Sequence, residues 1–330
     1  MEVMILTLNI DDYSFEKIFN RKDIKYSTKQ IKKYMSDLKD KTFVVAGVGS
    51  IGGNLAKRLA YFGCGWIDIF DISENNLCEV VDYFKTIGFE NYSSKLLDLK
   101  DPNFIPTVDC FSKPYYDYVI NTSAYKHVIF CENNHNLCYE NNTQIVENLL
   151  KISCGKHIFL STDKAVYPTS VMGKSKRLCE LLYLKDKPKS KIIRFGNVWG
   201  SSGSLLPRIL KNIENGTIEI TDKNAKRWFI SLEMATKFIM DTSLYSDKTI
   251  NVLNMGKQEN IMNIVNKIVK ISGKEVNIKY IGLTSGEKIT EELYYENKIP
   301  LMTFSNILSK YTEKYELFKD MAYLELDVME

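Results

Sequence analysis

The sequence predicts an α/β fold, a doubly wound parallel sheet with a smaller lobe contributed by the C-terminal half. Apolar strand-like runs alternate with helical patterns after residue 40, a glycine-rich turn follows the first run, and the order of elements becomes irregular after residue 199. Alternation of this kind is typical of parallel strands joined by helices. With 330 residues, the chain can form one elaborated domain or two that share an interface.

The elements of the first half follow a charged preamble over residues 1–40. We expect the parallel strands at 42–47, 66–71, 94–99, 117–122, 156–162 and 191–196. The segment after the first strand is predicted to be a helix with one face on the sheet, because its apolar residues recur at helical spacing, at Ile51, Leu55, Leu59 and Phe62.

The second half predicts a less regular order. A glycine and serine loop at 200–204 precedes a helix around 205–216, a short strand at 217–220 and a helix through 231–245. A further amphipathic helix is marked by Ile261, Ile264, Val265 and Ile268, before a strand-like run at 276–281. This half is expected to lie over the end of the sheet, where open α/β sheets bind ligands.

Composition excludes several classes of function. The net charge is +3 and the basic residues are spread along the chain, unlike the basic clusters of proteins that bind nucleic acid or a membrane surface. No apolar run approaches the roughly 20 residues of a membrane span, and no signal peptide is recognisable, so we expect a cytoplasmic protein. Seven cysteines without a Cys-x-x-Cys pair and three scattered histidines indicate neither disulfides nor a metal site.

The glycine-rich turn after the first strand carries Gly47, Gly49 and Gly52 in the spacing Gly-x-Gly-x-x-Gly. Such glycines allow a tight turn, backbone approach to a pyrophosphate and close packing of the following helix, whose N-terminus donates amides to the anion. Asp71 ends the next strand, roughly 20 residues on, as the dinucleotide fingerprint requires. The turn therefore predicts a Rossmann-type domain that binds a dinucleotide, the alternative being a purely structural turn.

Asp71 is expected to accept hydrogen bonds from the adenosine ribose and to repel a 2′-phosphate, which favours NAD over NADP. The alternative role is a helix N-cap. Ser73 is the better cap, because Glu74 and Glu79 follow it in the first turns of the next helix. Asp71 would then be free for the nucleotide.

Polar residues follow the fourth and fifth strands. The segment 121–128 lies where a nicotinamide ribose would sit, although Asn121 or Thr122 could instead cap a helix. Thr162, Asp163 and Lys164 would emerge beside the same nicotinamide, and three adjacent polar residues at a strand end favour a site over a core.

Residues 161–176 resemble the active-site segment of the short-chain dehydrogenase/reductases, where a Tyr-x-x-x-Lys pair shares one helix face. Here the pair reads Met172 and Lys176. Two other pairs, Tyr13 with Lys17 and Tyr183 with Lys187, are interpreted as chance spacings on exposed helix.

The chain resembles the extended members of that superfamily, and among them the nucleotide-sugar 4,6-dehydratases of the CapD-like polysaccharide-biosynthesis group. The resemblance covers nearly the whole chain through "SIGGNL", "SAYKHV", "STDKAVYPTSVMGKSKRLCE", "RFGNVWGSSGSLLP", "KRWFISLEMA" and "GEKITEEL". The preamble "FEKIFNRKDI" is similar to the linker that precedes the catalytic domain in longer, membrane-anchored members. One branch of this group carries methionine in place of the tyrosine, as at Met172.

The resemblance implies NAD-dependent conversion of UDP- or GDP-N-acetylglucosamine to a 4-keto-6-deoxy sugar, for surface polysaccharide or glycoprotein glycan synthesis, by a homo-oligomer. Its catalytic residues would be Thr162, Asp163, Lys164, Met172 and Lys176. Its cofactor residues would be Gly47, Gly49, Ser50, Ile51, Gly52, Asp71, Ser73, Asp98, Leu99, Thr122, Ser123, Ala124 and Lys176. Its substrate residues would be Lys126, His127, Asn197, Leu205, Arg208, Arg227 and Glu287.

The implied domains are an N-terminal helical preamble over 1–40, a NAD-binding domain over 41–198 with 231–256 contributing, and a nucleotide-sugar-binding lobe over 199–230 and 257–330. Two positions depart from the family pattern. Ala46 stands where the first family glycine is usual, and Thr284 replaces an arginine that would suit a pyrophosphate.

The chemistry requires a hydride to leave carbon 4 for NAD⁺ and return to carbon 6, a base for the carbon 5 proton and an acid for the departing 6-hydroxyl. We assign Thr162 to the 4-hydroxyl, Asp163 as the acid/base group and Lys164 as the carbon 5 base, with Lys176 on the nicotinamide ribose. Burial beside a positive ring favours the neutral lysine that this requires. Alternatively, Lys164 only pairs with Asp163 or with the substrate phosphate.

Two other functions stay open. A nucleotide-sugar epimerase would share the fold and NAD but normally needs the tyrosine, and a non-enzymatic NAD-sensing regulator would keep the glycine turn but not the active-site groups.

Overall fold

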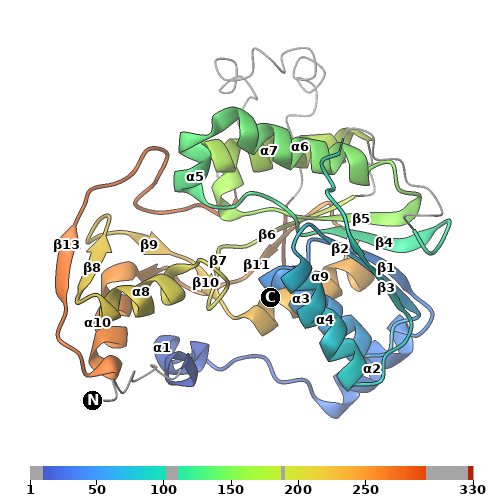
Figure 1. Cartoon of the computed structure of the whole chain (residues 1–330), viewed down its shortest axis with the longest axis horizontal. Helices are drawn as coiled ribbons and strands as arrows, with labels where there is room; N and C mark the ends of the chain where they lie inside the picture. Colours follow the sequence, from blue (N-terminus) through green and yellow to red (C-terminus); the bar gives the residue numbers. More distant parts are fainter. Residues whose placement is uncertain (1–9, 102–110, 187–189, 295–325, 330) are drawn as a thin grey trace.

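The structure, a computed structural model, describes residues 10–101, 111–186, 190–294 and 326–329. A large lobe built on a parallel sheet adjoins a smaller lobe, drawn at the left of Figure 1. The sheet contains, in spatial order, β14 (Leu326–Met329), β11 (Ile250–Leu253), β6 (Lys191–Arg194), β5 (Cys154–Leu160), β4 (Tyr116–Asn121), β1 (Thr42–Ala46), β2 (Trp66–Asp71) and β3 (Tyr92–Leu96).

All neighbouring strands of this sheet pair in parallel, which confirms the predicted α/β class. The order reverses between β1 and β4, and such a switch point is where open α/β sheets form their ligand crevice. The third strand begins two residues earlier than predicted, at Tyr92. In its parallel pairing with β2, Tyr92 lies opposite Ile67 and Leu96 lies opposite Asp71.

Helices cover both faces of the sheet, as a doubly wound fold requires (Figure 1). One face carries α2 (Thr28–Leu38), α3 (Ser50–Tyr61), α4 (Glu74–Thr86) and α9 (Leu232–Tyr245). The other carries α5 (Val128–Asn133), α6 (His135–Leu149) and α7 (Val171–Asp186). The predicted apolar face of α3 lies on the sheet, since Leu55, Leu59 and the capping Phe62 are buried in its core.

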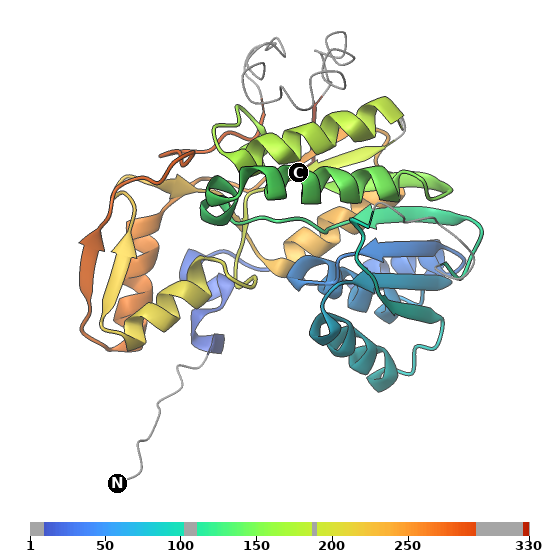
Figure 2. The same ribbon diagram turned by 45° about the horizontal axis from the view of Figure 1, so that its top comes forward.

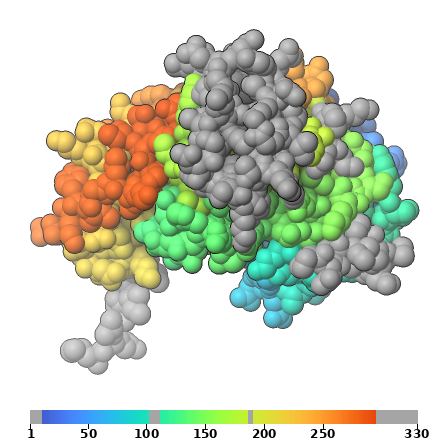
Figure 3. Space-filling model, turned by 90° about the horizontal axis from the view of Figure 1, so that it is seen from above, coloured from blue at the N-terminus to red at the C-terminus, as the bar shows by residue number. Residues whose placement is uncertain are grey.

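The smaller lobe contains α8 (Leu205–Glu214), β8 (Thr217–Ile220), α10 (Ile261–Ser272) and β13 (Asn277–Tyr280). β8 pairs with β13, and β9 (Lys226–Arg227) pairs with β12 (Glu259–Asn260). The pairing of β7 (Asn197–Val198) with β10 (Phe229–Ile230) lies between the two lobes. Seen from above in Figure 3, the smaller lobe, in yellow and orange, adjoins the green α5 to α7 layer.

The N-terminal segment divides between the lobes. The 3₁₀ turn η1 (Ile10–Tyr13) and α1 (Phe15–Phe19) pack in the core of the smaller lobe, whereas α2 packs in the core of the larger one (Figure 2). Residues 10–40 therefore bridge the two lobes, because apolar side chains of this range pack in the core of each.

The expectation that Tyr13 and Tyr183 lie on exposed helix is wrong, since their exposed fractions are 1% and 0%. Tyr183 faces the sheet from α7, where it stacks on Phe159 and its hydroxyl accepts a hydrogen bond from Asn121 Nδ2 at 3.2 Å. Lys187, its expected partner, lies outside the described residues.

Among the described ranges, no helix is both long and apolar enough to cross a bilayer. Within the same residues, no three histidine, cysteine, aspartate or glutamate side chains gather where they could hold a metal ion.

Candidate active site

The glycine turn after β1 has a distinct role for each glycine. Gly47 has φ +85°, and a Cβ there would lie 2.3 Å from Ser123 Oγ. A Cβ on Gly52 would lie 1.9 Å from Gly47 O, so the turn and α3 need this position bare. At Gly49, the N-cap of α3, a Cβ would meet no atom within 4 Å. The open space beside Gly49 fits a pyrophosphate, because it lies at the N-terminus of α3, where backbone amides can bind an anion.

Asp71, at the end of β2, is not free as expected. Its Oδ2 accepts from Val48 N at 2.7 Å and from Asn76 Nδ2 at 3.3 Å, and its Oδ1 accepts from Ser73 N at 2.8 Å. The carboxylate therefore also ties the glycine turn to β2. With about four lone-pair directions, it retains capacity for about one ribose hydroxyl. Ser73 caps α4 as predicted, accepting from Asn76 N at 3.4 Å.

The end of β4 closes against the glycine turn. Thr122 Oγ1 donates to Ala46 O at 3.1 Å, and Asn121 Oδ1 accepts from Ser123 N at 3.0 Å. Neither Asn121 nor Thr122 caps a helix, because α5 begins only at Val128 with His127 as its N-cap. Residues 122 and 123 therefore lie against the glycine turn, where the cofactor contacts were predicted.

Several other predicted cofactor residues make contacts within the protein. Ser50 Oγ accepts a hydrogen bond from Ser202 N at 2.9 Å, and Ile51 is half-buried in α3. Asp98 Oδ1 accepts from Lys100 N at 3.0 Å after β3. The side chain of Leu99 is buried in the core under α6, and its carbonyl accepts from Asn148 Nδ2 at 2.8 Å.

Thr162, Asp163 and Lys164 form one hydrogen-bonded cluster at the end of β5. Asp163 Oδ1 accepts from Thr162 Oγ1 at 2.8 Å and from Lys164 Nζ at 3.0 Å. The Asp163 side chain is fully buried, whereas that of Lys164 is 17% exposed. Asp163 Oδ2 has no hydrogen-bond partner among the described residues. The predicted cluster therefore has a buried carboxylate oxygen available and an amine that reaches solvent.

Glycines let neighbouring segments approach this cluster. A Cβ on Gly173 would lie 2.2 Å from Lys164 O, which brings the first turn of α7 against the lysine backbone. A Cβ on Gly196 would lie 2.6 Å from Trp228 Cβ and 3.1 Å from Asp163 Oδ2. The cluster is thus enclosed by α7 on one side and the chain after β6 on another.

Lys176 and Met172 occupy different environments on α7. Lys176 Nζ donates to Leu160 O at 2.9 Å and lies 4.6 Å from the centre of the Phe159 ring. Burial lowers the pKa of Lys176 to about 8. Met172 is buried in the apolar cluster of α5, α6 and α7, with Cys131, Cys138 and Leu178 among its members. Position 172 is therefore a packing position.

An ion-pair network that the sequence analysis missed fixes α7 to the sheet. Glu180 accepts from Arg194 Nε at 2.7 Å and Nη2 at 2.6 Å, from Arg177 at 2.7 Å, and from Ser161 Oγ at 2.6 Å. Burial opposes ionisation, but Arg194 and Arg177 hold the pKa of Glu180 at about 2. The available signal was an arginine inside the apolar run of β6. The network holds Ser161, the residue before the Thr162 cluster.

Basic side chains gather beside the loop at 200–204. Lys126 Nζ donates to Ser202 O at 2.8 Å, and Gly203, at φ +68°, lies so near His127 that a Cβ would be 2.7 Å from the ring. The pKa of His127 is lowered by burial and by the positive charges of Lys126 and Arg208. Burial also lowers the pKa of Lys126. Three predicted substrate residues thus gather where an anionic diphosphate would be stabilised.

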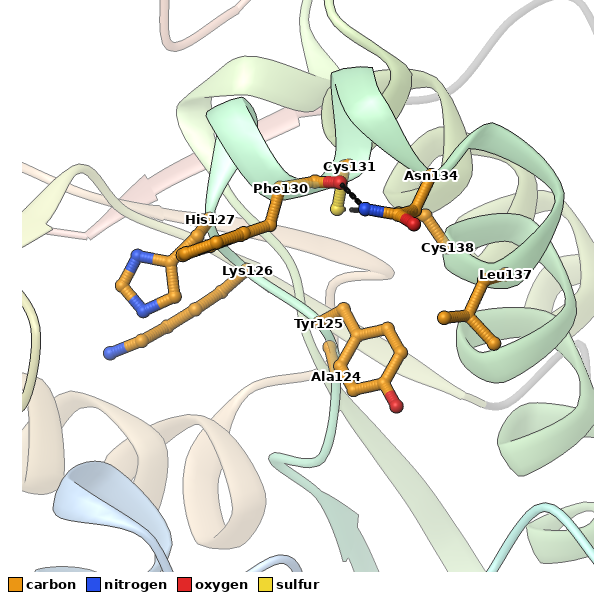
Figure 4. A pocket seen from close by; sticks show the side chains of 9 residues that line it. All are labelled: Ala124, Tyr125, Lys126, His127, Phe130, Cys131, Asn134, Leu137 and Cys138. Atoms are coloured by element: carbon orange, nitrogen blue, oxygen red, sulfur yellow. Dashed lines mark hydrogen bonds between the residues drawn. The ribbon is translucent and has the colours of Figure 1, made fainter.

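A pocket of about 440 Å³ adjoins this group. Figure 4 shows Lys126 and His127 next to each other on one side of it, with Tyr125 and Leu137 on the other.

Two further predicted substrate residues flank the loop at 200–204. Asn197 begins β7 before the loop, and Leu205 begins α8 after it.

Arg227 and Glu287 pair with each other inside the smaller lobe. Arg227 Nη2 lies 3.0 Å from Glu287 Oε1, and its Nη1 donates to Lys226 O and Ile289 O. Thr284 donates from its backbone and its hydroxyl to Glu287 Oε2, at 3.3 and 3.2 Å. Both terminal nitrogens of the Arg227 guanidinium therefore already donate hydrogen bonds within the protein.

Glu291 lies beside the Thr162 cluster, a position that the sequence did not predict. Its side chain is 4% exposed, and its Oε1 lies 3.9 Å from Lys164 Nζ. The only signal was the pair of adjacent glutamates in "GEKITEEL", which does not reveal which of them turns inward.

Comparisons with known proteins agree with this architecture. Residues 42–310 match the family described as "Polysaccharide biosynthesis protein". CapD of Staphylococcus aureus is 30% identical over 297 residues, which cover 84% of this chain and 49% of that protein. The probable polysaccharide biosynthesis protein EpsC of Bacillus subtilis is 29% identical, with 88% and 50% covered. The chain spans about half the length of these relatives.

Among solved structures, Pen from Bacillus thuringiensis is 27% identical, with a TM-score of 0.70 and 78% of this chain and 81% of that chain covered. DesIV, a dTDP-glucose 4,6-dehydratase of Streptomyces venezuelae solved with NAD bound, is 15% identical, with a TM-score of 0.64 and 85% and 98% covered. A UDP-N-acetylglucosamine 4-epimerase of Methanobrevibacter ruminantium is 21% identical, with the same TM-score and 86% and 97% covered. The last two show the fold alone. With the fold of the extended short-chain dehydrogenase/reductases, the chain belongs to the polysaccharide biosynthesis protein family.

Proposed function

We propose that the protein is an NAD-dependent nucleotide-sugar 4,6-dehydratase that acts on a UDP- or GDP-N-acetylglucosamine-type sugar. The observation that carries this proposal is the Thr162, Asp163 and Lys164 cluster at the end of β5, in a site where position 172 is buried packing. Acid, base and hydroxyl-binding groups are thereby supplied without a tyrosine. The family's link to polysaccharide biosynthesis supports a role in surface glycan synthesis.

NAD is the cofactor that these residues fit. Gly47, Gly49 and Gly52 would receive the pyrophosphate at the start of α3, and Asp71 would bind the ribose and repel a 2′-phosphate. When bound, NAD supplies the hydride acceptor for carbon 4 and the hydride donor for carbon 6. A tighter measured affinity for NADP⁺ than for NAD⁺ would count against this assignment.

The proton transfers balance over the chain's own residues. Thr162 binds the 4-hydroxyl of the sugar. The proton of that hydroxyl passes through the Thr162 hydroxyl to Asp163 Oδ1, which accepts a hydrogen bond from Thr162 Oγ1 at 2.8 Å. Neutral Lys164 takes the carbon 5 proton, and Asp163 gives its proton to the departing 6-hydroxyl, which leaves as water. Lys164 then returns its proton to carbon 5, so both groups end as they began.

Nucleotide-sugar epimerisation is the second candidate, because an epimerase shares the fold. Met172 is the observation against it, since a thioether has no proton to remove from or return to a hydroxyl. An NAD-sensing regulator without activity is disfavoured by the intact Thr162 cluster.

Mass spectrometry of the product separates these functions. The protein is incubated with NAD⁺ and either UDP- or GDP-N-acetylglucosamine, and the mass of the nucleotide sugar is then measured. We expect the loss of one water from one of them. An isomer of unchanged mass would indicate an epimerase, and absence of any turnover would favour the regulator.

A further inference from the structure

Glu291 lies in a segment that the structure fixes over the active-site loop. Lys288 Nζ donates to Val166 O at 3.0 Å, and Thr169 Oγ1 donates to Gly286 O at 2.7 Å. The carbonyl of Glu291 accepts from Trp228 Nε1 at 3.0 Å and from Gln258 Nε2 at 2.7 Å. These bonds join 286–291 to the chain after β5 and to the smaller lobe, so the backbone that carries Glu291 is held in place.

The Glu291 carboxylate faces several charged groups. Its Oε1 lies 3.9 Å from Lys164 Nζ, and its Oε2 lies 3.6 Å from Lys288 Nζ. Burial raises the pKa of Glu291; Lys164, Lys288 and Arg227 act in the lowering direction, and Asp163 in the raising one. Oε2 has no hydrogen-bond partner among the described residues. A buried carboxylate this close to the proposed base is costly unless it serves the site.

We propose that Glu291 is a positioning residue for Lys164. Its carboxylate lies within ion-pair distance of the amine that Asp163 also binds, and its charge sets the pH at which Lys164 can act as the carbon 5 base. This inference rests on the proposed function and adds a second carboxylate, beside that of Asp163, to the cluster.

The sign of the effect follows from the charges. An ionised carboxylate 3.9 Å from an amine favours the charged form of that amine. Loss of the Glu291 charge therefore favours the neutral amine and extends activity to lower pH. Two unit charges about 4 Å apart interact strongly enough, even at the dielectric constant of water, for a shift of roughly one pH unit.

The test compares kcat across pH for the full chain and three variants. In Glu291→Gln we expect the acidic limb of the profile to move down by roughly one pH unit, with KM for the nucleotide sugar changed less than about threefold. Glu291→Asp keeps the charge and should retain most of the wild-type limb. Glu292→Gln is the matched control, because Glu292 is 43% exposed and pairs with Lys288 at 2.8 Å. The inference is overturned if the Glu291→Gln limb coincides with that of wild type, or if Glu292→Gln moves it equally.

A second readout does not need turnover. Acylation of the Lys164 amine by acetic anhydride is followed across pH by mass spectrometry of the peptide that contains it, because only the neutral amine reacts. We expect the midpoint to be lower in Glu291→Gln than in wild type and in Glu292→Gln. A shifted midpoint without dehydration of either sugar overturns the proposed function alone. Dehydration with an unmoved midpoint overturns the role of Glu291 alone.

Discussion

Met172 and Lys164 show how differently two neighbouring parts of one segment are used. Met172 is buried among apolar side chains of α5 to α7, whereas Lys164 is partly exposed and bonded to a buried carboxylate. An apolar side chain is buried without the desolvation penalty of a charged group, and an ionisable one at a crevice retains access to substrate protons. The proposed chemistry therefore belongs to residues 162–164 and not to position 172.

Substitution at these two positions should have unequal effects on turnover. Lys164→Ala removes the proposed base, and we expect kcat to fall by a factor of roughly 10² to 10⁴. Met172→Leu keeps an apolar group of similar volume, so its packing cost should be under about 1.5 kcal/mol and its turnover within about tenfold of wild type. Steady-state rates measure both effects.

Thermal melting and NAD binding provide the control, because both variants must be folded and loaded. If Lys164→Ala kept nearly the wild-type turnover while Met172→Leu lost it, the assignment of the proton transfers to residues 162–164 would be wrong.

At the scale of elements, α7 is positioned by the charge network around Glu180. The helix carries Met172 and Lys176 and presses against the Lys164 backbone at Gly173. Glu180 joins it to β6 through Arg194 and to the end of β5 through Ser161. The network is structural, and its loss would displace the site through the helix that bears it.

The stability of the protein should depend on the ionisation of Glu180. Its pKa in the folded state, about 2, lies below the usual 4.5, so its contribution is present above pH 4.5 and is lost as the pH falls toward 2. A shift of this size corresponds to about 3 kcal/mol in the free energy of unfolding. In Glu180→Gln, two buried arginines lose their counter-ion, and we expect a loss of about 3–5 kcal/mol at about pH 7.

Urea unfolding at about pH 7 and about pH 3 measures this dependence, and the wild-type and Glu180→Gln curves should converge toward the lower pH. Glu79→Gln is the control, because the Glu79 side chain is 75% exposed and its pair with Lys57 should contribute less than about 1 kcal/mol. Equal losses in both variants at both pH values would contradict the account.

For the whole molecule, local patterns predicted the elements better than their contacts. Hydrophobic runs and the glycine spacing predicted the parallel strands and the turn, because both are properties of a few consecutive residues. The inward turn of Glu291 and the burial of Tyr183 depend on which segment covers which, and no local period encodes that. The same holds for Asp71, whose bond to Val48 N requires two strands to be adjacent first.

The candidate site was predicted in part for the same reason. Thr162, Asp163 and Lys164 are consecutive, so their proximity followed from the sequence, and the family resemblance supplied their roles. Glu291 is 127 positions beyond Lys164 in the numbering and reaches it only because the chain after the smaller lobe returns to the end of β5.

The central claim, an elimination across carbons 5 and 6 by the Thr162 cluster, is tested most directly by turnover in deuterated water. The protein is given NAD⁺ and UDP-N-acetylglucosamine in that solvent, and the product is examined by mass spectrometry and proton NMR. The account predicts a 4-keto-6-deoxy product that has lost one water and carries deuterium at carbon 5, because Lys164 exchanges its protons with solvent before it returns one. A dehydrated product with only the original hydrogen at carbon 5, or an unchanged mass with a new configuration at carbon 4, would contradict it.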